Sequence, residues 1–235
     1  TGWAGYSGGV LTPFAIAYHH ATAHGVLTAV HIPDSPDPVP EDVLARLPKR
    51  EAAFAKTLRG YRQVQFMGGR IAVRRACEQM GLNPQDILAD DRGAPQMPAG
   101  TVGSISHKRT IAVGMVARAV DGTLGVDIEE YAPARLSIAS AVLTEPEIAA
   151  ISHLDDERRW IATLLRFSIK ESIYKALDPY VRRYVGFHEA RVTPDLHGHA
   201  DVELSLVNGE GPFLVDARYE WLHGRLLTTV RIRPA

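Results

Sequence analysis

The 235-residue sequence is short of cysteine, of net charge and of long apolar runs. Cys77 is the only cysteine, which excludes a disulfide framework and a thiolate metal site and is typical of a reducing compartment. The formal net charge of −1 argues against a nucleic-acid binder held by overall charge. No apolar run approaches the roughly 20 residues of a membrane span. These absences predict a cytoplasmic protein that binds neither nucleic acid nor a membrane.

The composition is that of an ordinary globular protein, with 46% apolar and 23% charged residues. The length allows one large domain or two small ones, each with its own core. One local charge asymmetry stands out. Between Arg46 and Arg75 there are nine lysines and arginines, and Glu51 is the only acid.

The pattern of apolar residues and turn signals predicts a mixed chain of strands and helices. A helical pattern runs from Pro48 to Gly81, a capping pattern at Thr144–Glu147 opens a short helix, and a longer helix is expected over about 156–177. Strands are expected at 25–33, 102–105, 111–117, 123–129, 186–193, 200–206, 213–220 and 225–232, with a turn at 107–110. Strand–helix–strand therefore occurs twice, which predicts an α+β fold in two comparable halves, 1–120 and 121–235.

Two acids alternate on the strand expected at 123–129. Asp127 and Glu129 share one face, while Val126 and Ile128 face the core. Carboxylates roughly 7 Å apart repel each other unless they are exposed, protonated or bridged by a cation. Oxygen ligands of this kind suit Mg²⁺, which takes one or two carboxylates together with phosphates and water. The competing interpretation is a solvated strand edge.

The long helix carries a charged pair on an otherwise apolar cylinder. Glu171 and Lys175 stand one turn apart, and apolar residues line nearly every side of this helix, which is typical of a buried helix. A buried carboxylate and ammonium need a partner, and a metal with phosphates would supply one. The alternative is a surface ion pair of little energetic consequence.

Ser104, Ser106 and His107 lie where a strand is expected to end. A serine beside a histidine suggests nucleophilic catalysis, but no nucleophile-elbow pattern surrounds either serine. His107 with neighbouring hydroxyl and amide groups could instead hold a phosphate. A surface histidine at a strand end is the simpler alternative.

The basic helix carries Arg62 and Arg70 eight residues apart, on broadly the same side. Gly68 and Gly69 between them cost helix stability, up to about 1 kcal/mol each relative to alanine. Close approach of another part of the chain or of a ligand would explain that cost. Guanidinium groups bind phosphate oxygens in a bidentate manner, whereas the alternative is a solvated helix face.

The order and spacing of these motifs resemble one family. Asp127-Ile-Glu129, followed after about forty residues by Phe167-Ser-x-Lys-Glu-Ser-x-x-Lys175, is similar to the bipartite signature of Sfp-type 4′-phosphopantetheinyl transferases. Gly93-x-Pro95 and Ser104–His107 resemble earlier motifs of that family, and Arg62-x7-Arg70 resembles the arginine pair of its enterobactin-type branch. The resemblance spans about residues 49 to 175. Phe167 departs from it, since many relatives carry tryptophan there, and only packing consequences are expected.

The resemblance implies a pseudo-dimer of two similar halves, with coenzyme A in the cleft between them. It implies that Mg²⁺ and the pyrophosphate are bound by Asp127, Glu129 and Glu171. Lys175 would neutralise the phosphates, with Lys170 a weaker candidate. The 3′-phosphate and nucleotide end would be held by Arg62, Arg70 and His107, helped by Ser106 and Arg92.

The implied reaction is attack of a carrier-protein serine hydroxyl on the β-phosphorus of coenzyme A, with 3′,5′-ADP as leaving group. Glu171 is the first choice for the base that takes the serine proton, and Glu129 is the second. Two other functions stay open, a metal-dependent phosphoesterase and a non-catalytic carrier-protein or nucleotide-binding module. Some relatives are C-terminal domains of large synthases, including enediyne-type polyketide synthases, so a domain of such a synthase in secondary metabolism is a further expectation.

Overall fold

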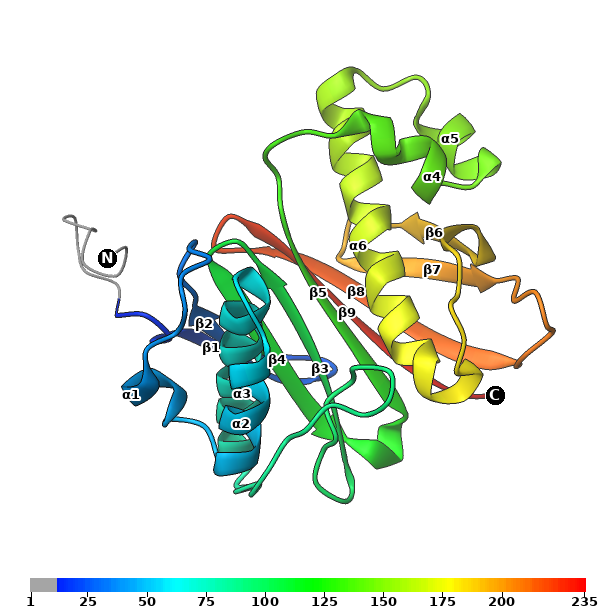
Figure 1. The fold of residues 1–235 in the computed structure, drawn as a ribbon. Coiled ribbons are helices and arrows are strands. Elements are labelled where there is room, and N and C mark those ends of the chain that lie inside the picture. Colours follow the sequence, from blue (N-terminus) through cyan, green and yellow to red (C-terminus); the bar gives the residue numbers. More distant parts are fainter. Residues whose placement is uncertain (1–11) are drawn as a thin grey trace. The chain divides into compact units, whose positions relative to one another are not determined.

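The computed structural model describes residues 12–235, which include every predicted site residue. The chain forms two compact units, Thr1–Arg118 and Ala119–Ala235. In each unit a long helix packs on one face of an antiparallel sheet (Figure 1). The predicted α+β fold with two halves of similar plan is thereby confirmed. Among the described residues no helix is long and apolar enough to cross a membrane.

The described part of the first unit consists of a four-stranded sheet and its helices. The sheet has the order β1-β2-β4-β3, and all neighbouring strands are antiparallel. Its strands are β1 (Ile16–Thr22), β2 (Gly25–His31), β3 (Thr101–Lys108) and β4 (Ile111–Arg118). The helices are α1 (Glu41–Leu44), α2 (Lys49–Thr57) and α3 (Tyr61–Gln79), of which α3 packs on the sheet.

Glycines bring α3 unusually close to its sheet. A Cβ atom on Gly68 would lie 2.2 Å from Cγ2 of Ile32, and one on Gly69 would lie 2.7 Å from Cγ2 of Ile105. From the sheet side, a Cβ on Gly114 would lie 2.2 Å from the backbone nitrogen of Val73. The glycine pair in the basic helix is therefore explained by helix–sheet packing, without a ligand.

The structure of this unit differs from the prediction at three places. The helical pattern after Pro48 is two helices, because Gly60 adopts φ 60° and breaks it between α2 and α3. No strand was predicted at residues 16–22, where β1 lies. His107 belongs to β3 rather than to a turn, since only Arg109 and Thr110 separate β3 from β4.

The second unit has a five-stranded antiparallel sheet of order β5-β9-β8-β7-β6. Its strands are β5 (Thr123–Glu130), β6 (Ala190–Pro194), β7 (His199–Leu204), β8 (Phe213–Leu222) and β9 (Arg225–Pro234). Two short helices, α4 (Ala139–Val142) and α5 (Glu145–Ile151), precede the 26-residue helix α6 (Asp156–Val181). The strand expected at 186–193 begins as a 3-10 turn, Phe187–Glu189, before β6.

Helix α6 lies across one face of this sheet (Figure 1). It supplies seven of the fifteen buried residues in the core cluster of this unit. Trp160, Ile169 and Ile173 are buried against apolar side chains of β6, β8 and β9. The contact with β5 is closest at Gly125, where a Cβ atom would lie 1.8 Å from the carbonyl oxygen of Ser172. Thr123 adds a hydrogen bond from Oγ1 to the carbonyl oxygen of Ala176, 2.6 Å long.

The close approach of α6 to β5 gives a stability prediction. In Gly125→Ala the new methyl group would have to push the backbone at Ser172 away, so we expect a loss of about 3 kcal/mol or more in the free energy of unfolding. Gly186→Ala is the control, because its Cβ would meet nothing nearer than 3.7 Å. That variant should stay within about 0.5 kcal/mol of the wild type. Urea unfolding measures both, and equal stability of the two variants would contradict the packing described here.

Candidate functional site

Asp127 and Glu129 project from β5 towards α6. Side chains alternate along a strand, so both acids share the face of Gly125, which contacts Ser172 of the helix. Asp127 is 5% exposed and Glu129 is 3% exposed. The solvated strand edge is thereby excluded for these acids, and their charges need compensation because burying an unpaired carboxylate is costly.

Asp127 receives compensation from α6. Ser168 Oγ donates a hydrogen bond to Asp127 Oδ2 over 2.8 Å, and Lys175 Nζ lies 3.2 Å from Oδ1. The same ammonium donates to the carbonyl oxygen of Val126 over 2.8 Å. Helix spacing left a surface ion pair between Glu171 and Lys175 open as the simpler alternative, and the structure pairs this lysine with Asp127 on the neighbouring strand.

Three buried hydroxyl groups around Asp127 were missed by sequence reasoning. Thr228 of β9 is the register partner of Asp127, and its Oγ1 lies 3.0 Å from Ser168 Oγ and 2.7 Å from Ser172 Oγ. The two serines stand one turn apart on the side of the helix that carries Lys175, a polar stripe that the sequence could have revealed. Nothing in the sequence pairs Thr228 with them, because it lies 60 residues from Ser168.

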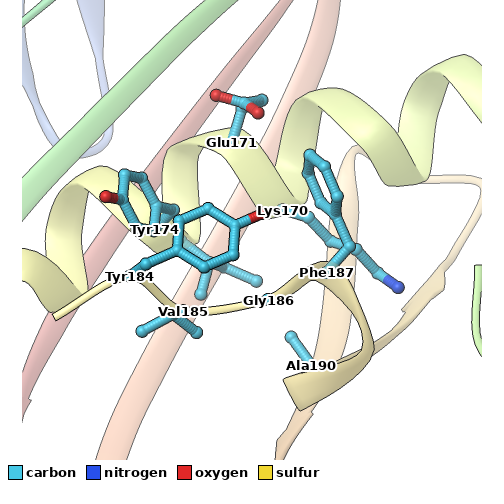
Figure 2. Close-up of a pocket in the computed structure, with 9 residues that line it drawn as sticks. Lys170, Glu171, Tyr174, Tyr184, Val185, Gly186, Phe187 and Ala190 are labelled. Atoms are coloured by element: carbon cyan, nitrogen blue, oxygen red, sulfur yellow. The ribbon is translucent and has the colours of Figure 1, made fainter. Parts of the chain in front are cut away.

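Glu171 stands beside this arrangement and is half-buried. It follows Ser168 by three residues and precedes Lys175 by four, so it shares their side of α6. It also borders a cavity of about 110 Å³, whose other lining residues include Tyr174, Tyr184 and Phe187. Figure 2 shows the Glu171 carboxylate pointing away from Val185 and Ala190, which places it at the rim of the cavity.

A divalent cation fits the chemistry of these donors. Among residues 12–235 no three histidine, cysteine or acidic side chains are grouped so that they could hold a metal ion, so the structure does not bring Asp127, Glu129 and Glu171 together as a three-residue metal site. Mg²⁺ does not require one, since it commonly binds one or two carboxylates and completes its shell with phosphate and water. Two buried carboxylates, one of them already facing the positive charge of Lys175, suit such an open oxygen site.

Lys170 has a different position from Lys175. Its ammonium donates to Glu147 Oε2 over 2.6 Å and to the carbonyl oxygen of Val142 over 2.8 Å, and the side chain is 1% exposed. Glu147 also accepts from the backbone amides of Thr144 and Val192, each over 2.7 Å. Burial lowers the pKa of Lys170, which Glu147 partly offsets. Lys170 therefore holds α5 and β6 against α6, and the phosphate contact predicted for it has no support from its position.

Arg70 and Arg62 lie on α3 in contrasting surroundings. Arg62 is exposed in the first turn, whereas Arg70 is 4% exposed and its guanidinium carbon lies 4.7 Å from the centre of the Phe66 ring. Burial lowers the pKa of Arg70 to about 10, so the group is still charged at neutral pH. Its buried Nε has no hydrogen-bond partner in the part of the chain that the structure describes. A buried, charged donor of this kind fits an anion.

The remaining predicted contacts are spread over the first unit. Ile105 of β3 contacts Gly69, so His107, two residues further on, faces the α3 side of the sheet and is exposed. Ser106 points to the opposite face and is buried, so the structure does not bring it together with His107. Arg92 is exposed in a turn in which Asp90 Oδ1 accepts from the Arg92 amide over 2.9 Å.

Comparison with known proteins connects both units to one family. The model of the 4′-phosphopantetheinyl transferase N-terminal domain matches residues 49–117, and that of the 4′-phosphopantetheinyl transferase superfamily matches residues 123–230. The chain is 32% identical to 4′-phosphopantetheinyl transferase Svp of Streptomyces mobaraensis over 198 residues, which cover 79% of this chain and 76% of that protein. It is 33% identical to the transferase Npt of Nocardia iowensis, over 74% of this chain and 75% of that protein. Among solved structures, a holo-(acyl-carrier-protein) synthase of Bacillus anthracis in complex with CoA (3′,5′-ADP) is 20% identical, with a TM-score of 0.40, over 48% of this chain and 96% of that one.

The ion pair of Lys170 gives a prediction that distinguishes a structural role of this lysine from a role in phosphate binding. Lys170→Met keeps the stem but leaves Glu147 buried without its cation, so we expect a loss of about 3 kcal/mol or more in the free energy of unfolding. Arg191→Met is the control at the exposed Arg191–Glu203 pair and should cost under about 1 kcal/mol. Urea unfolding measures both. A stable Lys170→Met protein with weakened coenzyme A binding would restore the phosphate role.

Proposed function

The chain belongs to the 4′-phosphopantetheinyl transferase superfamily, and we propose that it transfers 4′-phosphopantetheine from coenzyme A to a serine of a carrier protein. The observation that carries the proposal is the contact between β5 and α6. There the acids of the Asp127-Ile-Glu129 motif meet the helix side that presents Lys175 and Glu171. The carrier serine supplies the nucleophile, so the enzyme needs no nucleophile of its own.

Binding of the pyrophosphate is the first task of this side of the second unit. Asp127 and Glu129, with Glu171 beside them, would hold Mg²⁺ through carboxylate oxygens. When bound, the ion balances negative charge on the pyrophosphate and on the leaving oxygen. Lys175 is 26% exposed and its ammonium already faces Asp127, so it can donate to a phosphate oxygen without a large movement.

Removal of the serine proton is the second task. Glu171 is the favoured base because it is half-buried and stands at a cavity rim, where a carrier serine can approach it. Glu129 is 3% exposed and therefore less accessible to an incoming hydroxyl group. A carboxylate in hydrogen-bond reach of the serine accepts its proton as the oxygen attacks the β-phosphorus, and 3′,5′-ADP departs with the electrons of the broken P–O bond.

Recognition of the nucleotide end belongs to the first unit in this proposal. Arg70 offers a charged guanidinium with a buried Nε that has no partner among residues 12–235, which suits the 3′-phosphate of coenzyme A. Arg62 and His107 are exposed and add positive charge or hydrogen-bond donors. Arg92 and Ser106 are weaker members of the set, since one lies in a loop turn and the other faces away from His107.

Carrier loading tests the function directly. The protein is incubated with coenzyme A, MgCl₂ and an apo acyl carrier protein, and intact mass spectrometry should show one added phosphopantetheine that disappears in excess chelator. Glu171→Gln should lower turnover by about 100-fold or more, because the base is lost, while stability holds. Glu157→Gln, an exposed position of the same helix, is the control. Release of free phosphopantetheine without carrier would instead indicate a phosphoesterase, and near-normal loading by Glu171→Gln would assign the base to Glu129.

Substrate preference tests Arg70. Arg70→Met keeps the contact with Phe66 but removes the charge, so KM for coenzyme A should rise by roughly 10- to 100-fold, the effect of one charged hydrogen-bonded contact. Dephospho-coenzyme A lacks the 3′-phosphate, and the preference for coenzyme A over it should shrink by a similar factor. Arg75→Met, at an exposed pair with Glu78, is the control. An unchanged preference in Arg70→Met would show that this arginine does not bind the 3′-phosphate.

A further inference from the structure

Arg183 joins two carboxylates just after the end of α6. Its Nε lies 2.6 Å from Glu210 Oε1, and its Nη2 lies 3.1 Å from Oε2 of the same residue. The other edge of the guanidinium faces Glu189, with Nη1 3.0 Å from Oε1 and Nη2 2.7 Å from Oε2. Both contacts are bidentate, the geometry that gives arginine–carboxylate pairs their strength and direction. We call these three side chains the Arg183 clamp.

The clamp also fixes backbone on both sides. Glu189 accepts hydrogen bonds from the amides of Gly186 over 2.8 Å and Val207 over 2.9 Å. Glu210 accepts from the amide of Asn208 over 3.2 Å. The segment that follows α6 is therefore tied to the loop between β7 and β8, through charges that are only partly exposed.

The protonation states favour a closed clamp. Hydrogen bonds from Arg183 are the main cause that lowers the pKa of Glu189 and of Glu210 to about 2. The same bonds raise the pKa of Arg183 above its usual range. All three groups are therefore charged at neutral pH, and the clamp is intact there.

The clamped segment forms one wall of the cavity beside Glu171. Four consecutive residues line that wall, namely Tyr184, Val185, Gly186 and Phe187. The opposite wall is the turn of α6 that carries Glu171 and Tyr174, as Figure 2 shows. The rings of Tyr174 and Tyr184 lie 5.8 Å apart, so the two walls touch at that point. The position of the segment thus sets the width of the cavity.

The cavity has the size and lining of a site for a narrow chain. Its volume is about 110 Å³, and most of its lining is aromatic or aliphatic. In the proposed reaction, the pantetheine chain of coenzyme A adjoins the reacting phosphate and is a narrow chain of this kind.

We propose that Arg183 is a positioning residue for the transferase reaction: it holds the segment 184–187 at a fixed separation from α6 and so fixes the cavity that takes the substrate chain beside Glu171. This inference rests on the proposed function. Arg183 acts through the segment and not at the reacting atoms. Its Nη1 donates to the carbonyl oxygen of Tyr184 over 2.9 Å, and its partner Glu189 accepts from the amide of Gly186.

The test compares Arg183→Met and Glu210→Gln with Arg191→Met, whose exposed pair with Glu203 lies on β6 and β7 outside the cavity. Two quantities are measured on the folded proteins: hydrogen exchange of the Gly186 and Val207 amides, and kcat and KM for coenzyme A with a carrier protein. We expect faster exchange at both amides and a rise in KM of about tenfold, with kcat changed less, because a misplaced wall weakens binding more than proton transfer. The Arg191 variant should match the wild type in both measurements.

Arg183→Lys is a second variant in case Arg183→Met does not fold. It keeps the positive charge but cannot bind a carboxylate through two parallel hydrogen bonds. It should give the same pattern in milder form. Faster exchange with unchanged KM would overturn the inference, because the clamp would then be structural only, and unchanged exchange would show that the clamp does not hold the segment. A wild-type protein without carrier loading would instead refute the proposed function, whatever the exchange rates show.

Discussion

The second unit depends on one steric constraint: α6 lies so close to β5 that residue 125 has no room for a side chain. This approach buries Asp127, two residues along the same face, against the helix. A carboxylate in that position needs donors, and Ser168 and Lys175 supply them from the facing turns. The helix repeat also places Glu171 at this site, because it lies between Ser168 and Lys175 on the same side of α6. The packing contact and the candidate site are thus one feature, and a change at Gly125 should disturb both.

Sequence reasoning could predict the parts of this site that depend on local periodicity. Strand alternation placed Asp127 and Glu129 on one face, and helix spacing placed Glu171 beside Lys175. It could not predict contacts that depend on which elements pack together. Lys175 pairs with Asp127 across to β5, and the hydroxyl of Thr228 joins the cluster because β9 is the register partner of β5. In the first unit the broken helix at Gly60 was missed for a different reason, since the apolar spacing continued across the break while the backbone did not.

The two lysines of one motif show why sequence position alone does not assign a role. Lys170 and Lys175 are five residues apart, which turns them by about 140° to different sides of the helix. Lys170 meets Glu147 and a carbonyl oxygen in a nearly water-free corner, whereas Lys175 meets Asp127 at a partly open edge. Arg70 is as buried as Lys170 but differs in what it lacks, because its Nε has no partner within residues 12–235. Burial therefore does not separate structural from binding cations here, and neither does an unpartnered Nε alone, because Arg74, which pairs with Glu51, also has one among the described residues.

The same distinction applies to the acids. Glu51 is fully buried and accepts from Arg74 and, over 2.6 Å, from the amide of Ile87. Glu147 likewise combines a cation with backbone amides. Backbone donors are fixed by the fold, so these carboxylates cannot exchange partners without local unfolding. Asp127 receives a serine hydroxyl and a lysine ammonium, groups that rotate and can turn towards a phosphate or release an oxygen to a cation. Exchangeable partners at a buried acid are what a site that binds and releases a charged substrate requires, and Ser168 and Lys175 give Asp127 two partners of this kind.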